Sequence, residues 1–166
     1  MPLIHSSPSP GAYDADVLIA GAGPVGLTAA LNLVRCGISV IVLEAGARIF
    51  DDPRAGTIHP PTLEMFAPIG VTDLMLARGY VVRNYQYRDR HVGIVADFDI
   101  GVLADDTPYP YRLMLEQHKI CHILLDLLGT FPEARVLMEH RVMEVTQDDA
   151  GVTATVVAPD RPRAFR

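Results

Sequence analysis

Three glycines and one glutamate are the residues whose types and spacing point most clearly to chemistry. The chain reads Gly21-Ala-Gly-Pro-Val-Gly directly after the apolar run 17–20, and Glu44 follows a second apolar run, 40–43. A turn of this kind brings backbone N–H groups close to a pyrophosphate, and an acid about twenty residues further on accepts hydrogen bonds from a ribose. The pattern therefore predicts recognition of a dinucleotide.

Each residue of this pattern has an expected role. Gly21 allows the tight turn, Gly23 lets the backbone approach a pyrophosphate, and Gly26 permits close packing of helix on strand. A carboxylate at Glu44 would repel a 2′-phosphate, which disfavours NADP as the ligand of this fold. The candidate binding residues of this region are Gly21, Gly23, Pro24, Val25, Gly26, Glu44 and Ala45.

These residues need a strand, a helix and a second strand to position them. The sequence predicts a strand over 15–20, a helix over 24–36 and a strand over 39–43. The helix would direct its free N–H groups and the positive end of its dipole at the phosphates. A lone glycine turn could belong to a strand–helix–strand unit without a ligand, but the strand, helix and acid together favour a dinucleotide. We therefore expect an α/β, Rossmann-like fold with a parallel sheet.

The remainder of the chain adds helices and antiparallel strands. We expect a long ordered loop over 45–61, a hairpin within 80–100 and a flexible leader over 1–13. One domain would span 14–158, with a tail at 159–166. The other expected elements are helices over 61–67, 72–77 and 114–128, and strands over 135–138, 141–147 and 152–157.

The bulk composition narrows the class of protein. The 166 residues are 49% hydrophobic and 20% charged, with a formal net charge of −6, and both charge signs are dispersed. Such a chain is globular, and its charge argues against a nucleic-acid partner and against anionic membranes. Its two cysteines form no disulfide framework, which fits a cytoplasmic protein. A homo-oligomer remains an open alternative.

Three segments resemble one known family, the FAD-dependent aromatic hydroxylases typified by para-hydroxybenzoate hydroxylase. The first segment is Gly21-Ala-Gly-Pro-Val-Gly with Glu44. The second is Arg54-Ala-Gly-Thr-Ile-His-Pro-Pro-Thr-Leu-Glu-Met-Phe, and the third is Pro110-Tyr-Arg-Leu-Met-Leu-Glu-Gln-His-Lys. The resemblance covers about residues 14–158, nearly the whole chain.

The resemblance implies a cofactor and a reaction. In this family the counterpart of Arg54 reaches the flavin pyrophosphate and that of Gln117 contacts the cofactor, so FAD is expected rather than NAD. The family uses NAD(P)H and O2 to hydroxylate a small aromatic substrate. Because the flavin performs the oxygen chemistry, we assign no catalytic residue.

Two departures from the family pattern stand out. Pro61 replaces an arginine that many relatives carry, so one contact near the flavin or the pyridine nucleotide is expected to be lost. The family's later Asp-Gly and Gly-Asp motifs are not found in the chain. It therefore resembles the N-terminal FAD-binding fragment of a longer monooxygenase, and we expect these 166 residues alone to be inactive.

Other interpretations of these residues stay open. An NAD-dependent oxidoreductase and a non-catalytic dinucleotide-binding module both remain compatible with Glu44. His118 and His122 share a helix face near Cys121, but they lack a supporting set of ligands, so we expect no metal. His59 stays unassigned. Tyr85 and Tyr87 alternate along a strand and are expected to line one sheet face.

Overall fold

The computed structural model describes residues 13–51 and 53–166. These residues form two compact units. The first comprises the chain up to Ile49 together with Leu124–Arg166, and the second comprises Phe50–Ile123. The expected leader over 1–13 lies, except for Tyr13, outside the described residues. A single domain over 14–158 was expected, so the division into two units is a finding of the structure.

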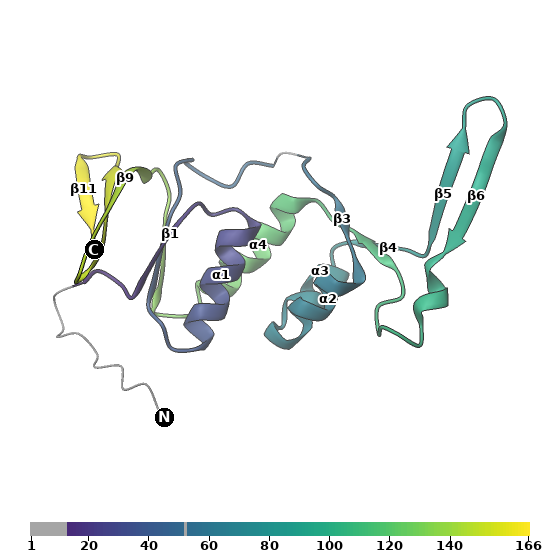
Figure 1. The fold of residues 1–166 in the computed structure, drawn as a ribbon, viewed down its shortest axis with the longest axis horizontal. Helices are drawn as coiled ribbons and strands as arrows, with labels where there is room; N and C mark the ends of the chain where they lie inside the picture. Colours follow the sequence, from purple (N-terminus) through teal and green to yellow (C-terminus); the bar gives the residue numbers. More distant parts are fainter. Residues whose placement is uncertain (1–12, 52) are drawn as a thin grey trace. The chain divides into compact units, whose positions relative to one another are not determined.

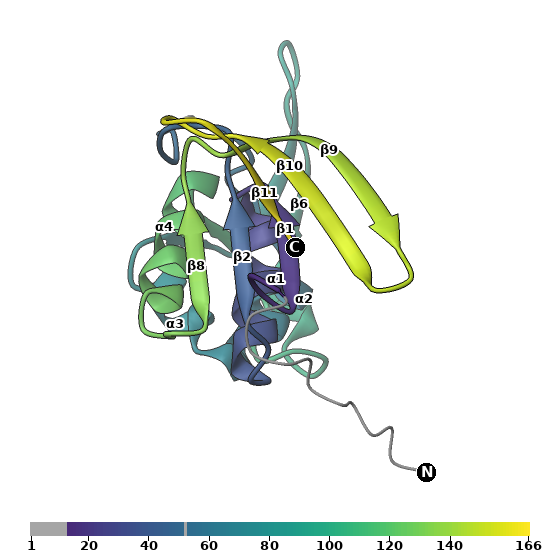
Figure 2. The same ribbon diagram turned by 90° about the vertical axis from the view of Figure 1, so that its left-hand side faces the viewer.

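A parallel sheet forms the centre of the first unit. It contains β1 (Val17–Ala20), β2 (Val40–Leu43) and β8 (Ala134–Leu137) in the order β1-β2-β8, as Figure 2 shows. Helix α1 (Pro24–Arg35) connects β1 to β2 and buries Leu27, Leu31 and Val34. All four residues of β2 are buried because the strand lies in the middle of the sheet.

An antiparallel sheet supplies a second layer of the first unit. It contains β9 (Arg141–Asp148), β10 (Gly151–Val157) and β11 (Pro162–Phe165) in the order β11-β10-β9. Ala154, Val156 and Phe165 share a buried cluster with Ile41 and Leu43 of β2. Residues 162–165 were expected in a tail and instead form β11, because pairing with β10 orders a segment that has little strand signal of its own.

The second unit combines short helices with short antiparallel strands. Its helices are α2 (Pro60–Phe66), the 3-10 turn η1 (Ala67–Ile69) and α3 (Val71–Leu76), whose buried residues include Leu63 and Met75. A sheet of order β3-β7-β4 is formed by β3 (Thr57–Ile58), β7 (Arg112–Met114) and β4 (Tyr80–Val82). Strands β5 (Asn84–Asp89) and β6 (Gly93–Asp99) form a hairpin, followed by the 3-10 turn η2 (Ile100–Leu103). Figure 1 shows this hairpin extending away from α2 and α3.

Helix α4 (Gln117–Leu128) begins in the second unit and ends in the first. It was expected to begin at residue 114, but residues 112–114 pair with β3 and β4 as strand β7. Strands as short as β3 and β7 carry almost no periodic signal in the sequence, so sequence patterning missed both. The expected α/β fold with a parallel sheet and added antiparallel strands is confirmed. Among the described residues, no helix is both long and apolar enough to cross a membrane.

Candidate functional site

The glycine turn between β1 and α1 is built as its spacing predicts. Gly21 has φ +105°, a backbone conformation that side chains disfavour, and its N–H donates to the Leu43 carbonyl at 2.8 Å. A Cβ placed on Gly26 would lie 2.1 Å from the Gly21 carbonyl oxygen and 3.2 Å from Cγ2 of Ile19. The conformational roles expected of Gly21 and Gly26 are therefore confirmed.

Gly23 differs from the other two glycines. It is the N-cap of α1 with an ordinary φ of −75°, and no protein atom lies within 4 Å of a Cβ built there. Pro24 occupies the first turn of the helix, and Val25 is 83% exposed. Nothing in the protein itself therefore requires glycine at position 23. Close approach of an anionic group to the N–H groups of the helix N-terminus would require it.

The Glu44 side chain is tied to the backbone on both of its oxygens. Oε2 accepts the N–H of Ala22 at 2.7 Å, and Oε1 accepts the N–H of Gly46 at 2.7 Å. A carboxylate offers about four lone-pair sites, so roughly two stay available for hydroxyl donors. The carboxylate is thus held in one place beside the glycine turn. Sequence spacing predicted the acid but not the Ala22 contact that fixes it.

Backbone hydrogen bonds to the end of β8 and to the residues that follow it hold the Glu44 backbone. Its N–H donates to the Leu137 carbonyl at 2.9 Å, and its carbonyl accepts the N–H of His140 at 2.7 Å. The N–H of Glu139, a residue with φ +58°, donates to the Gly46 carbonyl at 2.9 Å. Ala45, the last candidate of this region, is exposed between these anchors. No signal in the sequence marked residues 137–140 as supports of the site.

The second unit brings the other two candidate binding residues, Arg54 and Gln117, together. The N–H of Gln117 donates to the Arg54 carbonyl at 3.3 Å, and the N–H of Leu115 donates to the Gly56 carbonyl at 2.8 Å. Between Arg54 and Gly56, Ala55 has φ +26°, an uncommon conformation for a residue with a side chain. The start of α4 therefore fixes the backbone of the Arg54 loop, while the Arg54 residue itself is exposed.

Other side chains singled out in the sequence lie in the second unit. His118 and His122 stack edge to face with ring centroids 6.4 Å apart, and His122 lies 3.7 Å from an Asp51 carboxylate oxygen. Cys121 is buried, and burial raises the pKa of its thiol. Within the described ranges, no three His, Cys, Asp or Glu residues are grouped so that they could hold a metal ion. His59 is exposed and is the N-cap of α2.

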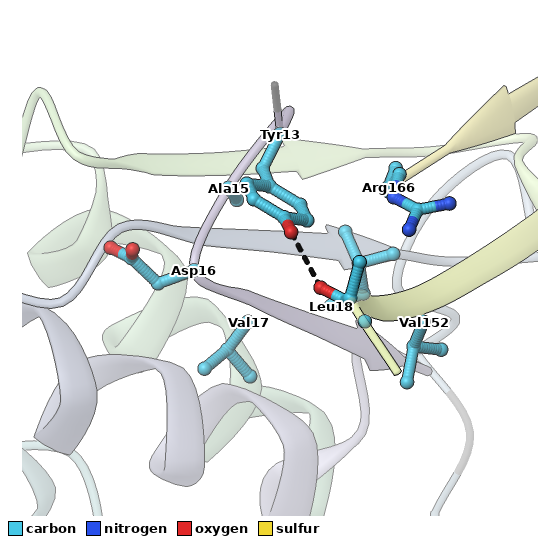
Figure 3. Close-up of a pocket in the computed structure, with 9 residues that line it drawn as sticks. Tyr13, Ala15, Asp16, Val17, Leu18, Val152 and Arg166 are labelled. Atoms are coloured by element: carbon cyan, nitrogen blue, oxygen red, sulfur yellow. Dashed lines mark hydrogen bonds between the residues drawn. The ribbon is translucent and has the colours of Figure 1, made fainter. Parts of the chain in front are cut away.

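A pocket of about 600 Å³ lies elsewhere in the first unit. Figure 3 shows it beside the start of β1, with Tyr13 and Leu18 facing Arg166 and Val152 of β10, while the Asp16 carboxylate points away from them. The Tyr13 hydroxyl donates to the Ala150 carbonyl across it. None of the predicted binding residues is among those that line this pocket. It is therefore distinct from the glycine turn, which follows the other end of β1.

Comparisons with protein families and with characterised proteins agree with one another. Residues 14–164 match the family described as "FAD binding domain". The chain is 37% identical over 143 residues to para-nitrophenol 4-monooxygenase of Pseudomonas sp. strain WBC-3, an alignment that covers 86% of this chain and 36% of that enzyme. It is 36% identical over 128 residues to 6-hydroxy-3-succinoylpyridine 3-monooxygenase of Pseudomonas putida, covering 77% of this chain and 33% of the relative.

Solved structures agree with the sequence relatives. The p-nitrophenol 4-monooxygenase of Pseudomonas putida DLL-E4 superposes with a TM-score of 0.88 at 33% identity, covering 90% of this chain and 38% of that structure. An aklavinone-11 hydroxylase solved with FAD and aklavinone gives a TM-score of 0.78 at 29% identity, covering 93% of this chain and 31% of its own. The chain thus spans about a third of the length of the relatives it matches.

Proposed function

Because this chain belongs to the FAD-binding domain family, we propose that it is the FAD-binding part of a flavin-dependent monooxygenase that hydroxylates an aromatic compound. The observation that carries the proposal is the fixed Glu44 carboxylate beside a turn whose Gly23 has no structural need to be glycine. The two features are suited to the ribose and the pyrophosphate of one adenine dinucleotide.

The residues of the chain fit the adenosine half of FAD. Glu44 would accept the ribose hydroxyls, while Gly23, Pro24, Val25 and the first turn of α1 would receive the pyrophosphate. Arg54 would add a cation for the phosphate oxygens, and Gln117 would contact the cofactor from the start of α4. When bound, the flavin supplies the redox and oxygen chemistry. The share of this chain is to bind and orient the adenosine end.

The co-substrates, the substrate class and the cellular location of the complete protein are part of the same proposal. NADH or NADPH would reduce the flavin, O2 would be the oxidant and a small aromatic molecule the substrate. The relatives named para-nitrophenol and 6-hydroxy-3-succinoylpyridine monooxygenases act on aromatic rings, which supports that substrate class. A cytoplasmic location is proposed on the two cysteines of the chain, neither of which forms a disulfide.

The test identifies the cofactor that the complete protein carries. The purified protein is denatured by heat, the precipitate is removed, and the supernatant is read by absorbance and resolved by chromatography. We expect a yellow supernatant containing FAD. A colourless supernatant containing NAD would favour an NAD-dependent oxidoreductase instead, and one with neither nucleotide would favour a module that does not retain a dinucleotide.

A second measurement addresses the reaction. Oxidation of NAD(P)H by the complete protein should accelerate when an aromatic substrate is added, and a hydroxylated product should form in step with it. The 166-residue chain alone should show no such activity, because the rest of the relatives' length is missing from it. Coupled hydroxylation by this chain by itself would contradict the proposal that its share is to bind and orient the adenosine end of FAD.

A further inference from the structure

The loop that carries Arg54 runs antiparallel to the segment that leads into α4. Strand β3, which follows the loop, pairs with β7, which precedes the helix. The alignment continues beyond the strands, because the N–H of Leu115 donates to the Gly56 carbonyl at 2.8 Å. The N–H of Gln117 then donates to the Arg54 carbonyl at 3.3 Å. Backbone hydrogen bonds therefore fix the loop on the side of Arg54 that continues into β3.

A different kind of contact lies on the other side of Arg54. Three residues before it, a carboxylate oxygen of Asp51 lies 3.7 Å from Nε2 of His122 on α4. The Asp51 side chain is 72% exposed and that of His122 47% exposed, so the two groups meet where water reaches both. The loop is thus held by backbone hydrogen bonds after Arg54 and contacts α4 through a pair of titratable side chains before it.

The neighbours of His122 on α4 leave its imidazole to the loop carboxylate. The His118 ring, one helical turn earlier, meets it edge to face with centroids 6.4 Å apart. Lys119 also lies on this side of the helix, but its ammonium group pairs with Glu116 at 2.8 Å. Asp126, four residues further along α4, is the acid that shares this helix face. The acid found within 4 Å of the imidazole is the one from the loop.

Protonation of the imidazole decides whether this contact is an ion pair. An ordinary histidine is positively charged below about pH 6.5, whereas an ordinary carboxyl group is negatively charged above about pH 4. In the acid part of this range the imidazolium attracts the Asp51 carboxylate and neutralises it. In the alkaline part the carboxylate is left uncompensated, three residues from Arg54 in the sequence. An anion there would compete for the guanidinium and repel a pyrophosphate that approaches it.

We propose that His122 and Asp51 are positioning residues for Arg54, which hold its loop on α4 and neutralise the nearby carboxylate when His122 is protonated. Neither residue needs to touch the cofactor, because both act through the loop. FAD should therefore bind more tightly at about pH 5.5 than at about pH 8. The inference rests on the proposed function, since it concerns how the chain presents Arg54 to the FAD pyrophosphate.

The first test needs no cofactor. The backbone amide signals of Arg54 and Ala55 and the ring signals of His122 are followed by NMR in the 166-residue chain, from about pH 5 to about pH 8. We expect the amide signals of wild type to shift together with the titration of the His122 ring. Asp51→Asn keeps the histidine but removes its partner, and it should abolish that shift. Amide signals that do not follow His122, or that follow it equally in Asp51→Asn, would overturn the proposal.

The second test measures the FAD affinity of the complete protein by fluorescence titration at the same two pH values. We expect wild type to bind FAD about two- to threefold more tightly at the lower pH, the size typical of a partly exposed ion pair. His122→Gln should show the weaker affinity at both pH values, and Asp51→Asn should show the stronger affinity at both. His122→Lys carries its charge throughout this range and should also bind with the stronger affinity at both.

A matched control and a second variant keep the outcome clear. His91→Gln removes an exposed histidine from the turn between β5 and β6, and it should leave the pH dependence of FAD binding unchanged. Should His122→Gln fail to fold, Asp51→Asn decides alone, because Asp51 is exposed. A pH dependence that persists in Asp51→Asn would overturn the proposal. Absence of FAD binding at either pH would instead contradict the proposed function, and the amide titration would still decide whether the pair holds the loop.

Discussion

The glycine turn with Glu44 and the Arg54–Gln117 loop junction differ in what holds them. In the first, a side chain is part of the scaffold, since the Glu44 carboxylate accepts two backbone N–H groups at 2.7 Å. In the second, backbone hydrogen bonds of 3.3 Å and 2.8 Å join the Arg54 loop to the start of α4, and Arg54 is exposed. Residues of the first region therefore serve the fold and the ligand together, whereas those of the second can serve the ligand with less consequence for the fold.

The strongest test of this difference lies within the glycine turn. Gly26→Ala should destabilise the chain by about 3 kcal/mol or more, because its Cβ would fall 2.1 Å from a backbone oxygen that cannot easily move. The matched variant Gly23→Ala should unfold close to wild type, because no protein atom lies within 4 Å of the new Cβ. Urea denaturation of both variants measures the contrast, and equal midpoints would refute it.

Glu44→Ala should affect both stability and cofactor binding. Loss of the two bonds to Ala22 and Gly46 and of the ribose acceptor should cost about 1–3 kcal/mol in FAD affinity of the complete protein. Denaturation of the same variant should show a loss of stability as well. Gly23→Val should weaken FAD more than Glu44→Ala does, and it should cost less stability than Gly26→Ala because a Cβ at that position meets no protein atom within 4 Å. Unchanged FAD affinity in both variants, measured by fluorescence titration, would overturn the assignment of this turn.

Arg54→Ala should show that the loop junction, unlike the glycine turn, contributes to FAD affinity more than to stability. We expect FAD affinity of the complete protein to fall by about 1 kcal/mol, since an exposed charge-assisted contact is partly screened by water. Stability should change less than in Glu44→Ala, because the bonds at the junction use the backbone of Arg54. Arg88→Ala is the control for loss of one positive charge. A larger loss of stability in Arg54→Ala than in Glu44→Ala would reverse the comparison.

The smallest expected effect is on the stability of the first unit at acid pH. Backbone N–H donation from Ala150, together with the Arg166 side chain, lowers the pKa of Asp148 at the β9–β10 turn. The bonds of the charged form therefore stabilise the fold above the ordinary carboxyl pKa, and this contribution is lost as pH falls through the lowered value. Asp148→Asn should reduce the decline of Tm below about pH 4, with Asp149→Asn as the matched variant. An identical decline in wild type and Asp148→Asn would contradict this.

The elements with a strong local signal were predictable from the sequence. Helix α1 and strands β1 and β2 lie within one or two residues of their expected bounds, because an apolar run and a glycine turn carry the information locally. Strands β3, β7 and β11 were missed, since their residues carry little strand signal of their own and form strands only because a partner pairs with them. For the same reason helix α4 begins three residues later than expected.

For the candidate site, the sequence by itself determined which residue types stand at the turn. A glycine at position 26 and an acid at position 44 follow from spacing, because the strand and helix between them have fixed lengths. Only the tertiary structure decided that the Ala22 N–H holds Glu44 and that a Cβ on Gly23 would meet no protein atom within 4 Å. The stacking of Arg112 on Tyr85 likewise joins positions 27 residues apart in the sequence, and no local pattern encodes such a contact. Local spacing sets which groups are present, and long-range packing sets where their donors, acceptors and charges meet.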